Sequence, residues 1–286
     1  EVIENELVEI KEKYADERRT RIIKMATEFN PEDMYADDDM VITISHLGYI
    51  KRTPLADFRQ QGRGGVGAKA SAARDEDFIE YVHQANMHST MMFFTEQGRL
   101  YWTKVYELPE GNRQSKGRAL QNMINIQKGD KVCAFIHVKN LNDMEYVQNH
   151  YLIFATKDGL MKKTTLESYS RPRANGIIAL GLREGDRLIR VTLTDGKSQM
   201  LIASYNGKVV RFPDDTVRPM GRTATGVRAI KLDEDGKDCV VGMICVEEGS
   251  KDTVLVISDK GYGKRTDLDD ENGEPIYRVT NRGGKG

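Results

Sequence analysis

The sequence has few of the residues that build metal, redox or membrane sites. Its three cysteines, Cys133, Cys239 and Cys245, form no CxxC pattern, which argues against a zinc site or a disulfide framework. Its five histidines form no ligand motif. No apolar run approaches the roughly 20 residues that a membrane-spanning helix needs, and the N-terminus lacks the basic start and apolar stretch of a signal peptide. We therefore expect a cytoplasmic protein with no metal or cofactor of its own and no membrane contact.

The chain has 286 residues, of which 39% are hydrophobic and 30% charged. This composition is typical of a globular protein with a proper core, and the length suits one large or two small domains. The chain does not begin with methionine, so we expect a fragment of a longer protein. The net charge of −1 would by itself argue against a nucleic-acid binder.

Residues 1–28 carry the one long helical pattern. Ile3, Leu7, Ile10 and Tyr14 recur at intervals of 4, 3 and 4 and form an apolar stripe. Asn30-Pro31 should end the helix. With the acidic link Asp37-Asp38-Asp39, this predicts a helical tail and linker over residues 1–39.

A repeat begins at residue 40. Each copy has an apolar β-type run, a turn with glycine and a second run that usually carries Lys or Arg. The turn glycines, at spacings of 50, 61, 48 and 54, are Gly48, Gly98, Gly159, Gly207 and Gly261. Each suits a β-hairpin, since glycine supplies the positive φ that such turns need. A second glycine follows 17 to 23 residues later, at Gly65, Gly117, Gly176, Gly226 and Gly284.

About 50 residues and four short strands per copy is the size of a propeller blade. The predicted blades span about 40–87, 88–148, 149–198, 199–250 and 251–286, and together make up a second domain, 40–286. An irregular β-sandwich is the other possibility, but five aligned copies argue against it.

Charge is segregated within the repeat. The segments 48–74, 97–118, 157–183, 207–231 and 260–286 hold 29 basic and 12 acidic residues, a net charge of +17, which leaves −18 for the rest. Equivalent segments of blades would form a positive band, and its natural ligand is a polyanion. The candidate DNA-binding side chains on this band are Lys51, Arg52, Arg63, Arg99, Lys104, Lys116, Arg118, Lys162, Lys163, Arg173, Lys208, Arg211, Arg222, Lys264 and Arg265.

One glycine-rich stretch, Gly62 to Gly67, matches GxGxxG. A dinucleotide site would need an acidic residue about 20 positions on, whereas Asp75-Glu76-Asp77 comes only some ten residues later. Arg63-Gly64-Gly65 also falls where the other copies have their second glycine. We therefore interpret it as a loop of small bulk that can approach a phosphate backbone.

The same stretch carries a family resemblance. The segment Gln61, Gly62, Arg63, Gly64, Gly65, Val66, Gly67 resembles the box Gln-Arg-Arg-Gly-Gly-Lys-Gly of the DNA gyrase A subunits, with Gly62 in place of Arg and Val66 in place of Lys. Further similar segments are Lys13–Thr20, Ser45–Arg52, Lys104–Pro109, Asn206–Phe212 and Gly261–Thr266.

This resemblance implies an all-β fold, a six-bladed, propeller-like β-pinwheel, here truncated in the fifth blade and preceded by a helix left from the catalytic part. It implies double-stranded DNA wrapped around the basic rim, which gives gyrase a chiral DNA crossing and so ATP-dependent negative supercoiling. The implied parent is a type IIA topoisomerase that acts with the gyrase B subunit in an A2B2 complex and uses ATP and Mg²⁺. Its active-site tyrosine lies outside this chain, so we expect no catalytic residue here.

Three alternatives remain. The equivalent domain of topoisomerase IV, which decatenates and relaxes DNA, tends to have a degenerate box, so the nearly intact box favours gyrase. A protein-binding propeller would show no rim of one charge sign. A nucleotide-dependent enzyme built on the GxGxxG stretch is the third and least favoured.

Overall fold

The computed structural model describes residues 1–17, 19–20, 30–58, 77–234, 236–247 and 249–286. They form two compact units, Glu1–Tyr35 and Ala36–Gly286, which we describe separately. In these described ranges, no helix is both long and apolar enough to cross a bilayer.

The first unit contains α1 (Val2–Tyr14) and a 3-10 helix, η1 (Pro31–Met34). The helix predicted over residues 1–28 thus ends early, because Ala15 is extended with φ −67° and ψ 128°. Asp16 follows, and an acidic side chain is unfavourable at the negative end of a helix dipole. Residues 18 and 21–29 of that prediction lie outside the described part of the chain. No side chain of α1 is buried.

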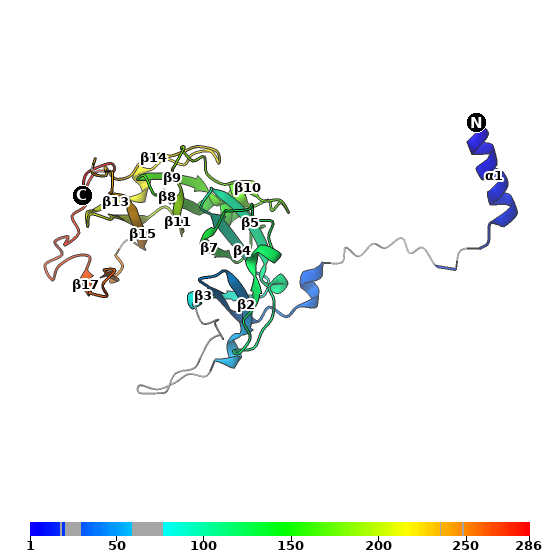
Figure 1. Cartoon of the computed structure of the whole chain (residues 1–286), viewed down its shortest axis with the longest axis horizontal. Helices are drawn as coiled ribbons and strands as arrows, with labels where there is room; N and C mark the ends of the chain where they lie inside the picture. The colour runs from blue at the N-terminus through cyan, green and yellow to red at the C-terminus, as the bar shows by residue number, and fades with distance from the viewer. Residues whose placement is uncertain (18, 21–29, 59–76, 235, 248) are drawn as a thin grey trace. The chain divides into compact units, whose positions relative to one another are not determined.

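The second unit is made of antiparallel sheets that succeed one another in chain order (Figure 1). The first sheet contains β1 (Asp39–Ser45), β2 (Tyr49–Pro54), β3 (Ile79–Asn86) and β6 (Arg118–Ala119). The second contains β4 (Thr90–Thr95), β5 (Arg99–Lys104), β7 (Val132–Val138) and β10 (Ile177–Ile178). The third contains β8 (Tyr151–Thr156), β9 (Leu160–Thr165), β11 (Leu188–Thr194) and β14 (Val227–Arg228). The fourth contains β12 (Ser198–Ser204), β13 (Val209–Pro213) and β15 (Val240–Glu247), and a hairpin follows with β16 (Thr253–Ile257) and β17 (Gly263–Asp267).

The all-β, propeller-like arrangement agrees with the sequence prediction, but the number of blades does not. The described residues form four sheets of three or four strands and one two-stranded hairpin, not six blades. The reason is the number of repeats, since the chain holds five copies and a sixth sheet has no residues to form it.

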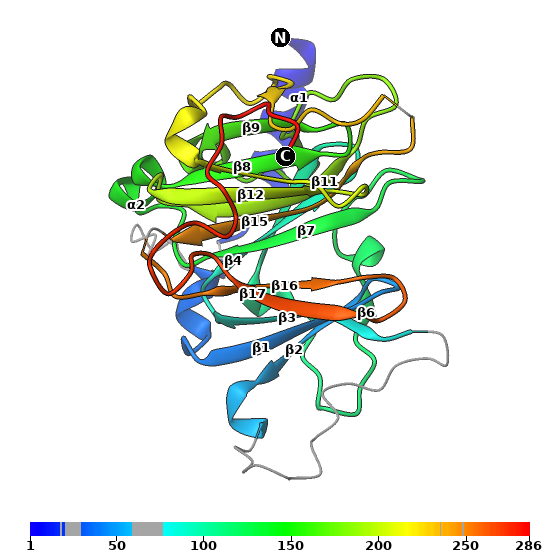
Figure 2. The same ribbon diagram turned by 90° about the vertical axis from the view of Figure 1, so that its left-hand side faces the viewer.

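Each of the first three sheets is completed by a short strand from the following repeat. Strand β6 of the second repeat pairs with β2, β10 of the third with β5, and β14 of the fourth with β9. The segment after β17 runs back to the fourth sheet (Figure 2), where Thr280 N–H donates to Arg211 O of β13 at 2.7 Å. Neighbouring repeats are therefore joined by main-chain hydrogen bonds.

The second glycine of each repeat sits where this borrowed strand begins. Gly117, Gly176 and Gly226 have φ of +79°, +65° and +93°, and a Cβ on any of them would overlap a carbonyl oxygen of the preceding repeat. Only glycine combines that conformation with that approach. In the fifth repeat the equivalent close approach is made by Gly286 and not by the predicted Gly284. Gly286 has φ +87°, and a Cβ added to it would lie 2.9 Å from Lys208 Cβ. The predicted Gly65 lies outside the described residues.

The core lies between successive sheets. In β4 the side chains of Met91 and Phe93 pack toward the first sheet, and those of Met92 and Phe94 pack toward the third. All six residues of β4 are buried. A strand covered on both faces is apolar at successive positions and does not alternate, which explains the continuous apolar runs of the repeat.

A 3-10 turn follows the second strand of each of the first four repeats. These turns are η2 (Leu55–Asp57), η3 (Val105–Glu107), η5 (Leu166–Tyr169) and η6 (Asp214–Thr216). The other helices among the described residues of this unit are η4 (Leu120–Asn122) and α2 (Met144–Asn149). The sequence reasoning missed α2. The Asp143 side chain caps α2 by accepting from Tyr146 N–H at 3.0 Å.

Candidate nucleic-acid interface

The fifteen basic residues predicted to contact DNA fall into distinct groups. Five are exposed, namely Lys116, Arg118, Arg173, Lys264 and Arg265. Four are half-buried, namely Arg99, Lys104, Lys208 and Arg222. Five are buried, namely Lys51, Arg52, Lys162, Lys163 and Arg211. Arg63 and the rest of the box, Gln61 to Gly67, lie outside the described residues.

Lys51 and Lys162 donate hydrogen bonds to main-chain oxygens, as the other three buried residues also do. Lys51, 1% exposed, lies on β2, and its Nζ donates to Asn112 O at 2.7 Å and Ser115 O at 3.0 Å. Lys162, 0% exposed, lies on β9, and its Nζ donates to Arg222 O at 2.6 Å. All three acceptors belong to the following repeat. Each of these two side chains is enclosed by protein, which argues against contact with phosphates. Their predicted DNA contact stays a prediction.

The environment of Lys162 is unusual for a lysine. Its Nζ also donates to Ala179 O at 2.5 Å and lies 3.3 Å from the Tyr169 hydroxyl, and it stands 4.8 Å from the centre of the Phe154 ring. Burial, with a smaller effect of the Arg222 charge, lowers the pKa of Lys162 to about 7. Burial also lowers the pKa of Lys51 from its ordinary value.

The other three buried cations occupy one equivalent position, four residues after the turn glycine, and each meets a carboxylate of the following repeat. Arg52 Nη1 lies 3.0 Å from Glu110 Oε2, Lys163 Nζ 3.5 Å from Asp214 Oδ1, and Arg211 Nη1 2.8 Å from Asp269 Oδ1. Each of these cations is thus paired with a carboxylate, which is buried at Asp214 and exposed at Glu110 and Asp269. Their burial argues against DNA contact, which stays a prediction. In the second repeat this position holds Trp102, whose Nε1 donates to Tyr169 O at 3.1 Å.

Three half-buried cations also have protein partners. Arg99 Nη2 donates to Asn175 O at 3.0 Å, Lys104 Nζ to His88 O at 3.1 Å, and Lys208 forms an ion pair of 2.5 Å with Asp233. These side chains are partly accessible, so the structure leaves their role toward DNA as a prediction.

The exposed cations lie on loops, on a borrowed strand and on the hairpin strand β17. Lys116 and Arg173 precede a second glycine, Arg118 is on β6, and Lys264 and Arg265 are on β17. Further exposed cations on equivalent segments were missed as individual residues, although the segment charges included them; among them are Arg171, Arg218, Arg228 and Lys285. Their position in the sequence could have identified them, because each lies within ten residues of a second glycine.

A second copy of the box pattern was also missed. Arg282-Gly283-Gly284-Lys285-Gly286 repeats the R-G-G-x-G pattern of residues 63–67. It runs beside the segment after β14, where Gly283 N–H donates to Ala229 O and Lys231 N–H to Gly284 O, both at 2.7 Å. Arg282 Nη1 donates to Arg228 O at 2.7 Å. This segment thus stands among exposed basic residues of the fourth and fifth repeats.

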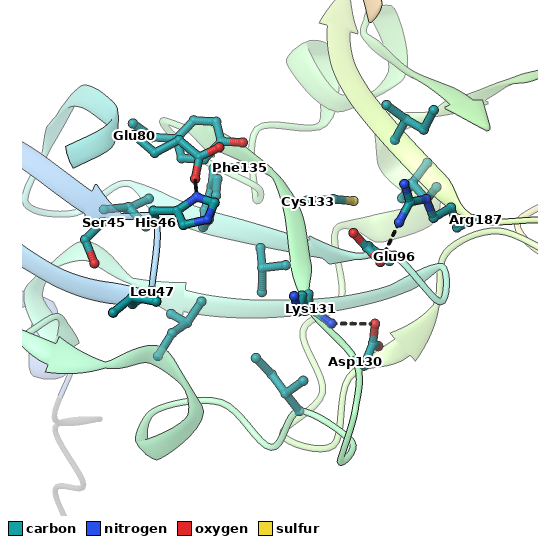
Figure 3. Close-up of a pocket in the computed structure, with 18 of the residues that line it drawn as sticks. Ser45, His46, Leu47, Glu80, Glu96, Asp130, Lys131, Cys133, Phe135 and Arg187 are labelled. Carbon is teal, nitrogen blue, oxygen red and sulfur yellow. Dashed lines mark hydrogen bonds and ion pairs between the residues drawn. The ribbon is translucent and has the colours of Figure 1, made fainter. Parts of the chain in front are cut away.

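A cavity of about 770 Å³ opens beside the hairpin turns of the first three repeats and reaches the start of β15 (Figure 3). It contains both signs of charge, with His46 Nδ1 3.0 Å from Glu80 Oε2 and Arg187 Nη1 3.6 Å from Glu96 Oε2. Burial raises the pKa of the Cys133 thiol to about 12, so this thiol stays protonated near neutral pH. The mixed charge distinguishes this cavity from the basic loops.

Within the described ranges, no group of three or more His, Cys, Asp or Glu side chains is placed to hold a metal ion.

The chain matches the family described as DNA gyrase C-terminal domain, beta-propeller, over residues 39–86, 89–139, 150–195, 198–247 and 252–286. It is 44% identical to the DNA gyrase A subunit of Salmonella typhimurium over 94% of this chain. It is 42% identical to the DNA gyrase A subunit of Staphylococcus epidermidis over 100% of this chain. The chain spans 30% and 31% of the length of these two relatives.

Two solved structures are similar in fold. The C-terminal domain of DNA topoisomerase IV has a TM-score of 0.69 and 26% identity, with 88% of this chain and 72% of that chain covered. The C-terminal domain of DNA gyrase A has a TM-score of 0.66 and 23% identity, with 87% and 76% covered.

Proposed function

Because this chain belongs to the family of DNA gyrase C-terminal, β-propeller domains, we propose that it binds and wraps double-stranded DNA without sequence preference along its exposed basic loops. One observation carries the proposal. Lys116 and Arg118, Arg171 and Arg173, and Arg218 and Arg228 recur on equivalent segments of the second, third and fourth repeats. Successive segments of this kind suit a regular polyanion that follows the repeats.

Phosphate contacts would supply the affinity. A duplex carries one negative charge per about 1.7 Å of its axis, and each phosphate that a lysine or arginine neutralises releases condensed counterions. Phosphate contacts carry no base information, and none of the described helices of the second unit is longer than the six residues of α2, too short to read a major groove in the usual way. Binding would therefore depend on charge and on the bending of the duplex.

In the parent enzyme this domain would give the DNA a crossing of fixed sign. Its relatives are gyrase A subunits, so we place the chain in an A2B2 complex with a gyrase B subunit, which uses ATP and Mg²⁺ to drive negative supercoiling. This chain would contribute wrapping and no catalytic residue. The complex would work in the cytoplasm, where its three unpaired cysteines stay reduced.

A topoisomerase IV domain is the second candidate, since one such domain has a TM-score of 0.69 with this chain. Two observations favour gyrase. The relatives that cover 94% and 100% of this chain are gyrase A subunits, and the stretch Gln61 to Gly67 is close to the gyrase box. A gyrase domain should wrap DNA with a fixed sign, whereas a topoisomerase IV domain would bind it without strong wrapping.

The test is to bind the chain to relaxed plasmid, ligate, remove the protein and measure the linking number. We expect a change of one sign that grows with the amount of protein, and tighter binding of a long duplex than of a short one in a gel shift. Binding with no change in linking number would favour topoisomerase IV. No DNA binding at all would leave the protein-binding propeller.

A further inference from the structure

We propose that Lys51 and Lys162 are positioning residues for DNA binding: each holds the basic loop of the following repeat in the shape that presents its exposed cations, and neither touches DNA. The inference rests on the proposed function and assigns it two residues that the duplex cannot reach. The loop held by Lys51 is 109–117, and the loop held by Lys162 is 217–226.

The two lysines are equivalent by position and by contact. Each lies three residues after a turn glycine, Gly48 or Gly159, on the second strand of its repeat. Each is at most 1% exposed, and each donates to carbonyl oxygens just before the second glycine of the next repeat. Two copies of one arrangement, 111 residues apart, are hard to explain as an accident of packing.

The contacts suit a loop that must meet phosphates. The carbonyls of Asn112, Ser115 and Arg222 turn their oxygens inward to an ammonium group. A carbonyl oxygen is the negative end of its dipole and would repel a phosphate. With these oxygens directed inward, the loops present cations outward, among them Lys116 and Arg218, which are exposed.

The fold itself does not require a lysine at this position. The second and fourth repeats have Tyr101 and Val210 there, and both are buried in the same kind of sheet. An apolar or aromatic residue therefore fills this position well. A buried ammonium group costs free energy that its hydrogen bonds must offset, so a lysine here indicates that those hydrogen bonds have a use. In the second repeat Arg99 reaches the following loop in its place, donating to Asn175 O at 3.0 Å.

A double-mutant cycle tests this on the 286-residue chain. Lys162→Met is made in the native chain and in a chain whose loop is neutralised by Arg218→Gln and Arg222→Gln. Dissociation constants for a long linear duplex of random sequence are measured at one salt concentration. We expect Lys162→Met to weaken binding about threefold to tenfold in the native chain, and by less than about twofold once the loop cations are gone, because residues that act through one another are not additive.

Lys51 provides the matched control. Lys51→Met should no longer weaken DNA binding when Arg113→Gln and Lys116→Gln neutralise the loop that Lys51 holds. It should weaken DNA binding as much as in the native chain when combined with Arg218→Gln and Arg222→Gln, which lie in a different loop. Thermal unfolding of each variant shows that it is folded; if Lys162→Met is not, the Lys51 cycle decides the question alone.

Equal factors in both backgrounds would overturn the inference, since they would mean direct contact with DNA or a general loss of structure. That result differs from failure of the proposed function, in which the unmodified chain would not bind DNA at all.

Discussion

At the scale of single residues, burial decides what a lysine or arginine does in this protein. Lys163 and Arg173 are both basic residues of the third repeat, yet Lys163 is 4% exposed and faces Asp214, whereas Arg173 is exposed on a loop. A buried cation whose partner is lost leaves an uncompensated charge, and an exposed one does not. A basic side chain therefore serves stability in one place, and in the other it is accessible for the DNA contact that we propose.

This contrast predicts opposite effects of two substitutions. Lys163→Gln should lower the free energy of unfolding by about 3 kcal/mol, because it leaves the Asp214 carboxylate buried without its cation. Arg173→Gln should change stability by less than about 0.5 kcal/mol but weaken binding on every duplex. Denaturant unfolding and gel shifts measure the two quantities. Equal stability of the two variants would contradict the assignment.

The lowered pKa of Lys162 predicts a dependence of stability on pH. Its folded pKa of about 7 lies below the ordinary 10.5, so between these values the unfolded chain binds more protons than the folded chain. The free energy of unfolding should therefore rise with pH across this window, by up to about 1.4 kcal/mol per pH unit from this residue. Below pH 7 both states are protonated and the slope vanishes.

Lys162→Met isolates that contribution, because the other titrating groups stay in the variant. Unfolding by urea at a series of pH values should give a steeper rise for the unmodified chain than for Lys162→Met. If the two chains rise in parallel between pH 7 and 10, the ammonium group is not destabilised by its surroundings.

At the scale of elements, the borrowed strands β6, β10 and β14 connect the repeats. Each has only two residues, so its position depends on the glycine at its start rather than on strand length. The main chain can approach the preceding repeat closely there because no Cβ intervenes. We expect these glycines to matter more for stability than the hairpin glycines.

Gly226→Ala should destabilise the domain strongly, since its φ is +93° and its Cβ would overlap the carbonyl of Met161. The matched control is Gly207→Ala, at φ +79° with nothing within 4 Å of the new Cβ. The control should cost about 1 to 2 kcal/mol for the left-handed conformation alone, and Gly226→Ala should cost clearly more. Denaturant unfolding of the two variants checks the order, and equal costs would show that the close approach is unimportant.

At the scale of the whole molecule, the proposed function depends on many weak contacts in series. The segments that bear the turn and second glycines sum to +17 within a chain of net charge −1. Exposed members of this set recur on the second to fourth repeats. Removing a single exposed cation should therefore weaken binding only modestly, while salt should matter greatly.

If about ten phosphates are neutralised, the logarithm of the binding constant should fall against the logarithm of salt concentration with a slope of roughly −9. Gel shifts on two unrelated duplexes of the same length should give the same slope. A salt-independent affinity, or a strong preference for one sequence, would refute charge-driven binding.

The box should affect wrapping more than affinity. One loop supplies few of the phosphate contacts, but bending a duplex costs several kcal/mol, so losing a contact at the first repeat could release the end of the wrapped DNA. Replacing Gln61 to Gly67 with alanines should abolish supercoiling by the reconstituted parent enzyme and leave relaxation largely intact. Supercoiling at the normal rate would contradict both the role of the box and the choice of gyrase over topoisomerase IV.

Sequence alone was enough to determine the repeat and the family. Hairpin glycines such as Gly48 and Gly159, and apolar runs such as that of β4, are local features, because a turn and a doubly covered strand each require particular residues at adjacent positions. The charge of each repeat was also readable, since it is a sum over a segment.

Tertiary structure alone decided which of those charges face outward. Lys51 and Lys116 are both lysines of basic segments, but only the pairing of β2 with the loop of the next repeat buries the first and exposes the second. That partner lies 61 to 64 residues away along the chain, beyond the reach of any local pattern. The sequence could not show that Gly286, rather than Gly284, makes the close approach in the fifth repeat. That contact depends on the backbone of the preceding repeat, which is distant in the sequence.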